Sequence, residues 1–285
     1  MSKAETGRLC VGVDLHKTQF TICALNEDGE YLLEKQYPTK EEGYSEFARE
    51  MHRFEEQGCS IELAVETTGN ARFFKNRMES EFFAVKVVNT NRFKVITMST
   101  KKTDANDAAT LAYYLMKDML PEAHLCSQTS EEIRRLLKTR SVLVQSMVKI
   151  KNQIHGMMLG YGIETKAAQL QSKRKRQELI NDLEDHNFSA YTAPSLKVML
   201  KILDDLSAEI KGIEKLLEEM VASNEDVALL MTVPGIGINT ATVIAAYTAE
   251  LERFEGNYKK FASYVGIIPS VHNSNETTHY GRITK

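Results

Sequence analysis

The sequence lacks any long apolar run. Nowhere in its 285 residues does an uninterrupted apolar stretch reach the roughly eighteen residues that a membrane-spanning helix requires. The first residues, Met1 to Arg8, are polar and lack the apolar segment of a signal peptide. We therefore expect a cytoplasmic protein that has no membrane partner.

Paired cysteines are also missing. Cys10, Cys23, Cys59 and Cys126 are scattered along the chain, and no Cys-x-x-Cys pair occurs. Neither a zinc site nor a disulfide framework is indicated by this spacing. Reduced thiols, as in the cytosol, are the simplest interpretation.

The whole chain has no excess of positive charge, since its net charge is −3. The charges are nevertheless segregated, because residues 133–177 sum to +10 and residues 178–228 sum to −8. A polyanion responds to the local field, so the basic block favours phosphate contact over the alternative, a solvated helix face. The basic residues that we expect to contact nucleic acid here are Arg134, Arg135, Lys173, Arg174, Lys175 and Arg176.

What is present indicates a mixed α/β region at the N-terminus. The length favours two or more domains, and 42% hydrophobic with 26% charged residues is typical of a globular protein. Three strands joined by hairpins, followed by strands alternating with helices, predict a mixed sheet covered by helices. This order matches a ribonuclease H-like fold, in which the first and fourth strands are neighbours. The expected strands span 9–13, 20–25, 31–36, 61–65 and 83–88, and the expected helices span 42–57 and 71–80.

Four acidic residues are expected to converge in that fold. Asp14 and Glu66 follow the first and fourth strands, and strand ends are where α/β sheets build their sites. Asp104 and Asp107 share one face of a helix that Thr103 can cap. Alone, this pair is better explained by the preference of aspartate for a first helical turn. Four converging carboxylates, however, require a cation, and their oxygen atoms suit Mg²⁺ or Mn²⁺.

Amide and basic side chains flank this acidic group. They occur in the loop 89–94 and just before Thr103. Such groups are expected where a phosphate backbone approaches a metal site, although a polar surface loop is an equally good interpretation. The residues that we assign to nucleic-acid contact are Arg92, Lys94, Lys101 and Lys102.

A helical pattern replaces the α/β pattern from about Glu131. Apolar residues recur at steps of three and four over 133–157 and again over 196–220. These are heptad seams of about four repeats each, which predict a coiled coil. An antiparallel hairpin within one chain and a homodimer satisfy them equally. Arg140 lies at a seam position and can set the register.

The C-terminal part contains the pattern of a helix-hairpin-helix unit. A helix is expected near 226–231, followed by Pro-Gly-Ile-Gly at 234–237 and a second helix rich in small residues. Gly235 and Gly237 would let backbone N–H groups approach a phosphate at the N-terminus of that helix. The alternative is simply a tight connection between two helices.

Six short segments together resemble one family. They are Val-Gly-Val-Asp-Leu-His-Lys at 11–17, Val-Glu-Thr-Thr-Gly at 65–69, Lys-Thr-Asp at 102–104 with Asp-Ala at 107–108, Val-Pro-Gly-Ile-Gly at 233–237, Gly-Ile-Ile-Pro at 266–269, and Gly-Arg-Ile-Thr-Lys at 281–285. In this order they resemble the DEDD transposases of insertion sequence family 110, which includes the Piv-type DNA invertases. The first three segments resemble the RuvC-like domain of that family, and the others resemble its second domain.

The resemblance implies a DNA transposase or recombinase with a mostly α-helical remainder after the RuvC-like domain. It implies that Asp14, Glu66, Asp104 and Asp107 bind Mg²⁺ or Mn²⁺ and that Ser274 forms a covalent phosphoserine. Expected partners are DNA, a structured guide RNA and further copies of the chain, as a dimer or tetramer. Because the family continues beyond Gly-x-Ile-x-Lys, we expect a truncated member. The expected domains are 1–125 (catalytic), 126–224 (helical) and 225–285 (serine domain).

Three other functions are considered. A structure-specific nuclease, like the Holliday-junction resolvases, would use the same four acids with water as the nucleophile. An actin-like ATPase or sugar kinase would need a glycine-rich phosphate turn after Asp14, and Leu-His-Lys-Thr at 15–18 supplies none. An inactive nucleic-acid-binding remnant is the third alternative.

Overall fold

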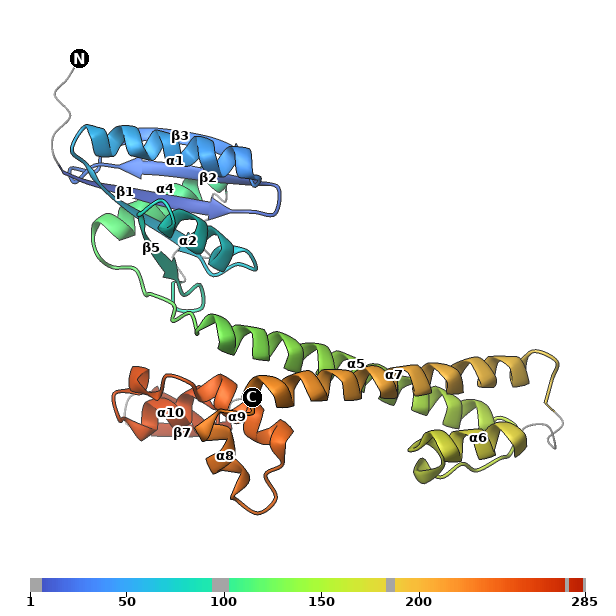
Figure 1. Ribbon diagram of the computed structural model, residues 1–285. Coiled ribbons are helices and arrows are strands. Elements are labelled where there is room, and N and C mark those ends of the chain that lie inside the picture. The colour runs from blue at the N-terminus through green and yellow to red at the C-terminus, as the bar shows by residue number, and fades with distance from the viewer. Residues whose placement is uncertain (1–6, 94–102, 183–187, 275–276, 284–285) are drawn as a thin grey trace. The chain divides into compact units, whose positions relative to one another are not determined.

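The computed structural model describes residues 7–93, 103–182, 188–274 and 277–283. The chain divides into two compact units, residues 1–125 and 126–285, and each is described by itself. Figure 1 shows the course of the chain and labels its elements.

Unit 1 is built on a five-stranded mixed sheet of order β3-β2-β1-β4-β5. The pairs β1–β2 and β2–β3 are antiparallel, whereas β1–β4 and β4–β5 are parallel. The predicted adjacency of the first and fourth strands is thus confirmed. The strands are β1 (Arg8–Leu15), β2 (Gln19–Leu25), β3 (Tyr31–Pro38), β4 (Ser60–Glu66) and β5 (Ala84–Val88).

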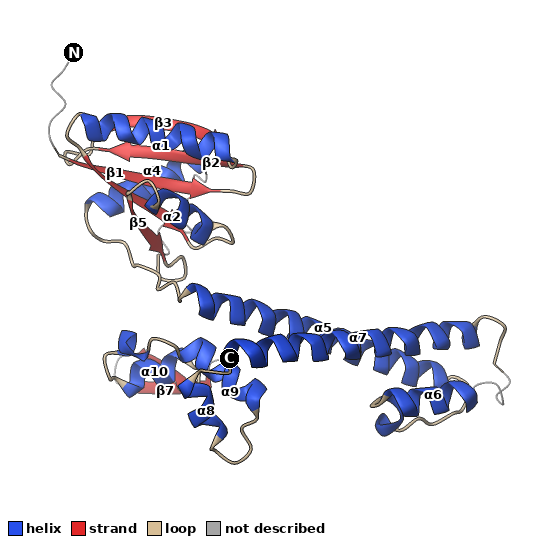
Figure 2. Cartoon of the chain, in the orientation of Figure 1, coloured by secondary structure: helices blue, strands red, loops and turns tan. Residues whose placement is uncertain are grey.

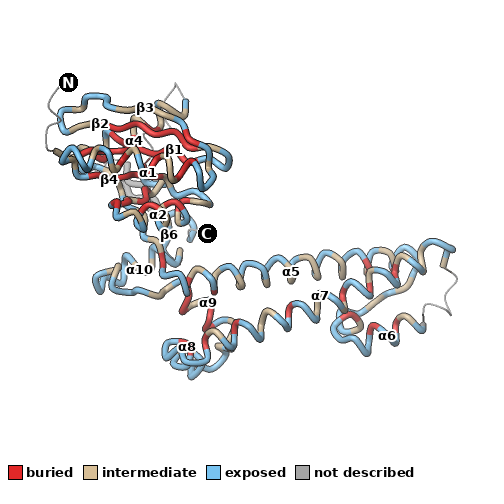
Figure 3. The backbone as a smooth tube through the Cα atoms, turned by 45° about the horizontal axis from the view of Figure 1, so that its top comes forward, coloured by how far each residue is buried: buried red, intermediate tan, exposed pale blue. Residues whose placement is uncertain are grey.

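Helices cover both faces of this sheet, as Figure 2 shows. Successive side chains of a strand point to opposite faces, and in β1 Val11 joins a core with α1 and α2, whereas Cys10 joins a core with α4. The central strands are therefore buried on both sides, which is visible as the red segments of the sheet in Figure 3. The helices are α1 (Glu41–Glu56), α2 (Ala71–Glu79) and α4 (Asp104–Met116).

Unit 2 is mostly helical and ends in a two-stranded sheet. Its long helices are α5 (Gln128–Leu159) and α7 (Thr192–Val221). The β6–β7 hairpin was not predicted from the sequence. The remaining elements are η1 (Ala167–Leu170), α6 (Lys173–Asp182), α8 (Glu225–Met231), α9 (Ile238–Thr248), η2 (Leu251–Phe254), α10 (Tyr258–Tyr264), β6 (Pro269–Ser274) and β7 (Thr277–Ile283).

Helices α5 and α7 pack against each other within one chain. Ile133, near the start of α5, shares a core with Leu217, near the end of α7. Ile154, near the end of α5, shares a core with Leu196, near the start of α7. The pair is therefore antiparallel and satisfies the two apolar seams without a second copy.

Polar contacts fix the register of these helices. Arg140 of α5 forms an ion pair of 2.7 Å with Glu214 of α7, as expected for a polar residue at a seam position. Glu214 also accepts a hydrogen bond from Asn239 of α9 at 3.3 Å. Pro194 lies in the first turn of α7, where a backbone N–H is not needed.

In the described parts of the chain, no helix is long and apolar enough to span a membrane.

Candidate active site

Asp14 and Glu66 lie at the same end of two neighbouring strands. Val13 of β1 is paired in parallel with Val65 of β4, so the following residues, Asp14 and Glu66, lie side by side in the last part of their strands. Both are partly buried. The two strands thus place two carboxyl groups at one edge of the sheet, as the sequence predicted.

Helix α4 brings the other two acids. The Thr103 side chain accepts a hydrogen bond from the backbone N–H of Asn106 at 3.3 Å, which caps the helix. Asp104 and Asp107 therefore occupy its first turn, where the helix dipole favours negative charge. Their position follows from the capping residue that the sequence indicated.

Gly12 sets how closely α4 approaches the sheet. A Cβ atom at this position would lie 2.0 Å from the backbone oxygen of Ala108 and 2.5 Å from the backbone nitrogen of Ala112. The backbone of α4 consequently packs directly on β1, with Ala108 and Ala112 fully buried. This close contact places Asp104 and Asp107 near the strand end.

The four carboxyl groups interact electrostatically. Burial raises the pKa of Asp14 above its ordinary value, and the negative charges of Asp104 and Asp107 raise it further, whereas His16 lowers it. Burial likewise raises the pKa of Glu66, and Asp14 and Asp107 add to the rise. Each acid is therefore coupled to another one, and the structure brings together all four residues that the sequence singled out.

A histidine joins this group. His16 Nε2 lies 3.0 Å from an oxygen of Asp14 and 3.5 Å from an oxygen of Asp104. Its backbone oxygen accepts hydrogen bonds from the side chains of Thr39 at 3.0 Å and Asn70 at 3.2 Å, so the turn after β1 is held in place. The sequence interpretation assigned His16 no role, although its spacing of two residues from Asp14 was a usable signal.

The donor set fits a divalent cation. One ligand atom each from Asp14, His16 and Asp104 lies within 4.8 Å of the others, and carboxylate oxygens are the ligands that Mg²⁺ and Mn²⁺ prefer. The raised pKa of Asp14 reflects burial and repulsion between like charges, and a cation would offset both. Two carboxylates and one imidazole are therefore close enough to bind a cation together, and metal binding stays a prediction.

The basic residues expected near this site are described in part. Arg92 is exposed, in a turn where the Asn89 side chain accepts hydrogen bonds from the backbone of Asn91 and Arg92. Lys94, Lys101 and Lys102 lie outside the described residues.

Two of the arginines expected to bind phosphate make contacts within unit 2. Arg176 is 2% exposed, and its guanidinium contacts the Asp204 carboxylate at 2.5 Å and the backbone oxygen of Leu170 at 3.0 Å. Arg134 donates to the backbone oxygen of Ala246 at 2.9 Å and lies over the Tyr247 ring at 4.6 Å. Both guanidinium groups make these contacts inside the fold, so we leave them out of the exposed basic surface, and their contact with nucleic acid stays a prediction.

The other basic candidates remain exposed. Lys173 and Lys175 are on the surface of α6, and Arg174 is exposed beside Glu178 at 3.0 Å. Arg135 is exposed and contacts Glu131 within the same helix. The basic face of α6 that can meet a polyanion thus consists of Lys173, Arg174 and Lys175.

The turn between α8 and α9 has the predicted glycines. Gly235 has a φ of +91°, a conformation that glycine adopts without strain. Gly237 is the N-cap of α9. Two short helices joined by a tight turn are therefore present, and a contact of this turn with phosphate stays a prediction.

Ser274 is the last residue of β6, paired with Thr277 of β7. Only the backbone of Ser274 is described here. Its predicted role as the nucleophile stays a prediction.

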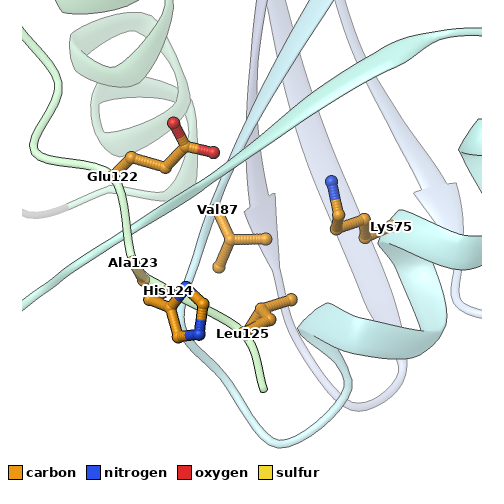
Figure 4. A pocket seen from close by; sticks show the side chains of 6 residues that line it. All are labelled: Lys75, Val87, Glu122, Ala123, His124 and Leu125. Carbon is orange, nitrogen blue, oxygen red and sulfur yellow. The ribbon is translucent and has the colours of Figure 1, made fainter. Parts of the chain in front are cut away.

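A separate pocket lies at the β5 edge of unit 1. It has a volume of about 450 Å³ and is lined in part by Lys75 of α2 and by Glu122 and His124 of the segment after α4 (Figure 4). The Lys75 ammonium group donates a hydrogen bond of 2.8 Å to the backbone oxygen of Val85 there. None of the four acids lines this pocket, so we place the candidate active site at the strand ends instead.

Comparison with known proteins decides the family. Residues 11–163 match the DEDD transposases of the IS110 type, and residues 227–285 match the transposases of the IS116/IS110/IS902 family. The chain belongs to the IS110 family of DEDD transposases. The first match contains all four acids, and the second contains Ser274 and both turn glycines. The family predicted from the six short segments is thus confirmed.

Individual relatives have low sequence identity to this chain, but each similarity extends over most of both proteins. The transposase for insertion sequence element IS1328 of Yersinia enterocolitica is 25% identical over 91% of this chain and 73% of its own length. The transposase for IS1111A of Coxiella burnetii is 23% identical over 93% of this chain and 69% of its own. A probable family 20 transposase of Pseudomonas aeruginosa is 20% identical over 96% and 78%. The chain is accordingly an enzyme that acts on DNA in transposition.

Proposed function

We propose that this transposase cleaves and rejoins DNA strands with divalent metal ions, Mg²⁺ or Mn²⁺, held by Asp14, Glu66, Asp104 and Asp107. The observation that carries the proposal is the geometry of one sheet edge, where Asp14 and Glu66 lie at the ends of paired strands and Asp104 and Asp107 lie in the first turn of the helix packed on β1. Bound divalent ions supply activation of a phosphodiester and stabilisation of the leaving oxygen.

The protein's own residues hold this arrangement before DNA arrives. Gly12 lets α4 contact β1, and the Thr103 cap fixes where the first turn of α4 begins. His16 lies between Asp14 and Asp104. A site whose ligands are already positioned avoids the cost of ordering them during the reaction.

Ser274 is the proposed nucleophile. Its hydroxyl oxygen would form a bond to the phosphorus while the bond to the leaving deoxyribose oxygen breaks and that oxygen takes up a proton. The phosphoserine linkage keeps the energy of the phosphodiester for rejoining. The support is the family match of residues 227–285 and the position of Ser274 as the last residue of β6.

Nucleic-acid contact is proposed for the exposed basic residues. The basic face of α6 carries three adjacent exposed cations, which suit a phosphate backbone. The α8–α9 turn offers backbone N–H groups at a helix N-terminus. A structured guide RNA and a homo-oligomer are proposed partners on the basis of the family resemblance.

A metal-dependent nuclease that uses water is the second candidate. All four acids and His16 belong to unit 1, so hydrolysis would need no nucleophile from unit 2. The two functions differ in one product, since only the serine mechanism leaves protein covalently attached to DNA.

The test is DNA cleavage by the full chain with Mg²⁺ and its cognate RNA. We expect a protein–DNA adduct that Ser274→Ala abolishes and that Ser141→Ala, an exposed serine of α5, leaves intact. An adduct that persists in Ser274→Ala would exclude Ser274, and cleavage without any adduct would favour the water nuclease. Metal binding without cleavage would instead indicate a nucleic-acid-binding remnant.

The acids are tested in the same assay. We expect Asp104→Ala to abolish cleavage, whereas Asp28→Ala, an exposed aspartate in the turn between β2 and β3, leaves it unchanged. Unchanged cleavage by Asp104→Ala would refute the metal assignment.

A further inference from the structure

A second cavity opens beside His16, where β1 ends and α1 begins. We call it the strand-end pocket. It has a volume of about 710 Å³, within the range of roughly 300–1,000 Å³ common for small-molecule sites. The residues used in the argument below are His16, Lys17, Lys40, Tyr44, Asn70 and Phe73, all of which line it.

One wall of the strand-end pocket is aromatic. Phe73 of α2 is 56% exposed, although a large apolar ring gains free energy when it is buried. Its ring centre lies 5.6 Å from that of Tyr44, at an angle of 60°. An exposed aromatic face beside a cavity is suited to stacking with a flat ring, such as a nucleobase.

Tyr44, one of the residues that line the pocket, has a hydroxyl group without a hydrogen-bond partner in the described part of the chain. Tyr44 is 2% exposed, and this hydroxyl is buried. Leaving a buried polar group unpaired costs free energy, which a ligand atom could recover. Burial raises the pKa of Tyr44 above its ordinary value, with a smaller contribution from Glu41, so the group stays a neutral hydroxyl that can donate.

The charge at the rim is positive. Lys17 and Lys40, which both line the pocket, are exposed. The acid beside them, Glu41, forms an ion pair of 2.8 Å with Arg77 of α2, which also pairs with Glu81. Two exposed cations next to an aromatic wall fit a phosphate attached to a base.

The strand-end pocket and the acidic site share His16. Its imidazole contacts Asp14 and Asp104, while its backbone oxygen is held by Asn70 at 3.2 Å. A polymer whose phosphate lies at the four acids therefore has its next unit within reach of the pocket.

We propose that the strand-end pocket holds one nucleotide of the DNA strand next to the phosphate at the four acids. The base stacks on Phe73, the Tyr44 hydroxyl donates a hydrogen bond to the nucleotide, and Lys17 and Lys40 contact phosphate. The proposal rests on the proposed function, because it takes the four acids as the place where DNA is cut.

The first test locates the contact directly. The full-length protein is irradiated with a short single-stranded oligodeoxynucleotide that contains 5-iodo-2′-deoxyuridine, and the cross-linked peptide is identified by mass spectrometry. We expect an adduct on Phe73 or Tyr44. Adducts confined to other peptides would overturn the proposal.

The second test measures affinity for the same oligonucleotide by fluorescence anisotropy. Phe73→Ala should weaken binding about tenfold, the effect of losing one stacked base. Phe82→Ala is the matched control, because Phe82 is 93% exposed and does not line the pocket. Equal affinities of these two variants would overturn the proposal, as would a loss seen only with an oligoribonucleotide.

Tyr44→Phe separates binding from folding. Removing a hydroxyl that has no partner should leave the melting temperature unchanged or higher while weakening the oligonucleotide complex. A lower melting temperature with unchanged affinity would assign the hydroxyl a structural role instead. The proposed function fails separately, if Asp104→Asn binds the oligonucleotide normally and still cleaves DNA.

Discussion

At the scale of single residues, placing acidic side chains close together in a partly buried site lowers the stability of the folded protein. Burial and mutual repulsion raise the pKa of Asp14, which means that the ionised carboxylate is less stable in the folded protein than in the unfolded chain. This destabilisation is present above the raised pKa, including neutral pH, and disappears as the pH falls and the group takes up a proton.

We therefore predict that Asp14→Asn raises the melting temperature of the metal-free protein at neutral pH, because the substitution removes a partly buried charge that its acidic neighbours repel. Thermal unfolding in the presence of a chelator measures this. The gain should vanish at a pH where Asp14 is protonated in the folded wild type. An unchanged or lower melting temperature at neutral pH would show that repulsion at the site is negligible.

Substitutions of Arg176 and Arg174 on α6 are predicted to have different effects on stability and on DNA affinity. Arg176→Met leaves the partly buried Asp204 carboxylate without its partner and should destabilise the protein by roughly 3–5 kcal/mol. Arg174→Met removes an exposed charge and should lower DNA affinity with a stability change within about 0.5 kcal/mol. Chemical unfolding and DNA binding measured on both variants check this, and a stable Arg176→Met would contradict it.

Individual residues also show which features could not be predicted from the sequence alone. Arg174 and Arg176 are both basic residues of one run, and only the fold reveals that the second faces Asp204. His16 was overlooked because its contact with Asp104 joins residues far apart in the chain. Asp14 and Glu66 could be predicted because strand ends are recognisable from apolar runs.

At the scale of elements, the contact between β1 and α4 controls the geometry of the acids. A methyl group at Gly12 would overlap the backbone oxygen of Ala108 at 2.0 Å, so the helix must move away from the strand. Gly69 offers a control in the same unit, because a Cβ atom there would meet nothing within 4 Å.

We predict that Gly12→Ala destabilises unit 1 by about 1–3 kcal/mol through overpacking and also weakens Mn²⁺ binding. Gly69→Ala should change neither quantity appreciably. Unfolding curves and metal titrations of the two variants provide the comparison. Normal Mn²⁺ affinity in a folded Gly12→Ala protein would show that the close approach of α4 is not needed for the site.

Elements with local signals were predictable, and others were not. The start of α4 follows directly from the Thr103 cap, because capping depends on adjacent residues alone. The partner of the α5 seam did not follow from the sequence, since an apolar stripe packs equally well on its own chain or on another copy. The β6–β7 hairpin was missed because 269–283 lacks a regular alternation of apolar and polar residues.

At the scale of the whole molecule, the residues of the proposed chemistry are divided between two units. The four acids and the strand-end pocket belong to residues 1–125, whereas Ser274 and the basic face of α6 belong to residues 126–285. The family match spans both. Metal binding can thus be tested in variants that lack Ser274. Covalent attachment of DNA to Ser274 can be tested in variants altered in the strand-end pocket.

The central claim is that the four acids form one site for divalent cations, and calorimetric titration of the full chain with MnCl₂ tests it most directly. The account predicts saturable binding that Glu66→Gln and Asp104→Asn each weaken by at least about tenfold, while Asp28→Asn leaves it unchanged. Equal Mn²⁺ affinity in all four proteins would contradict the account.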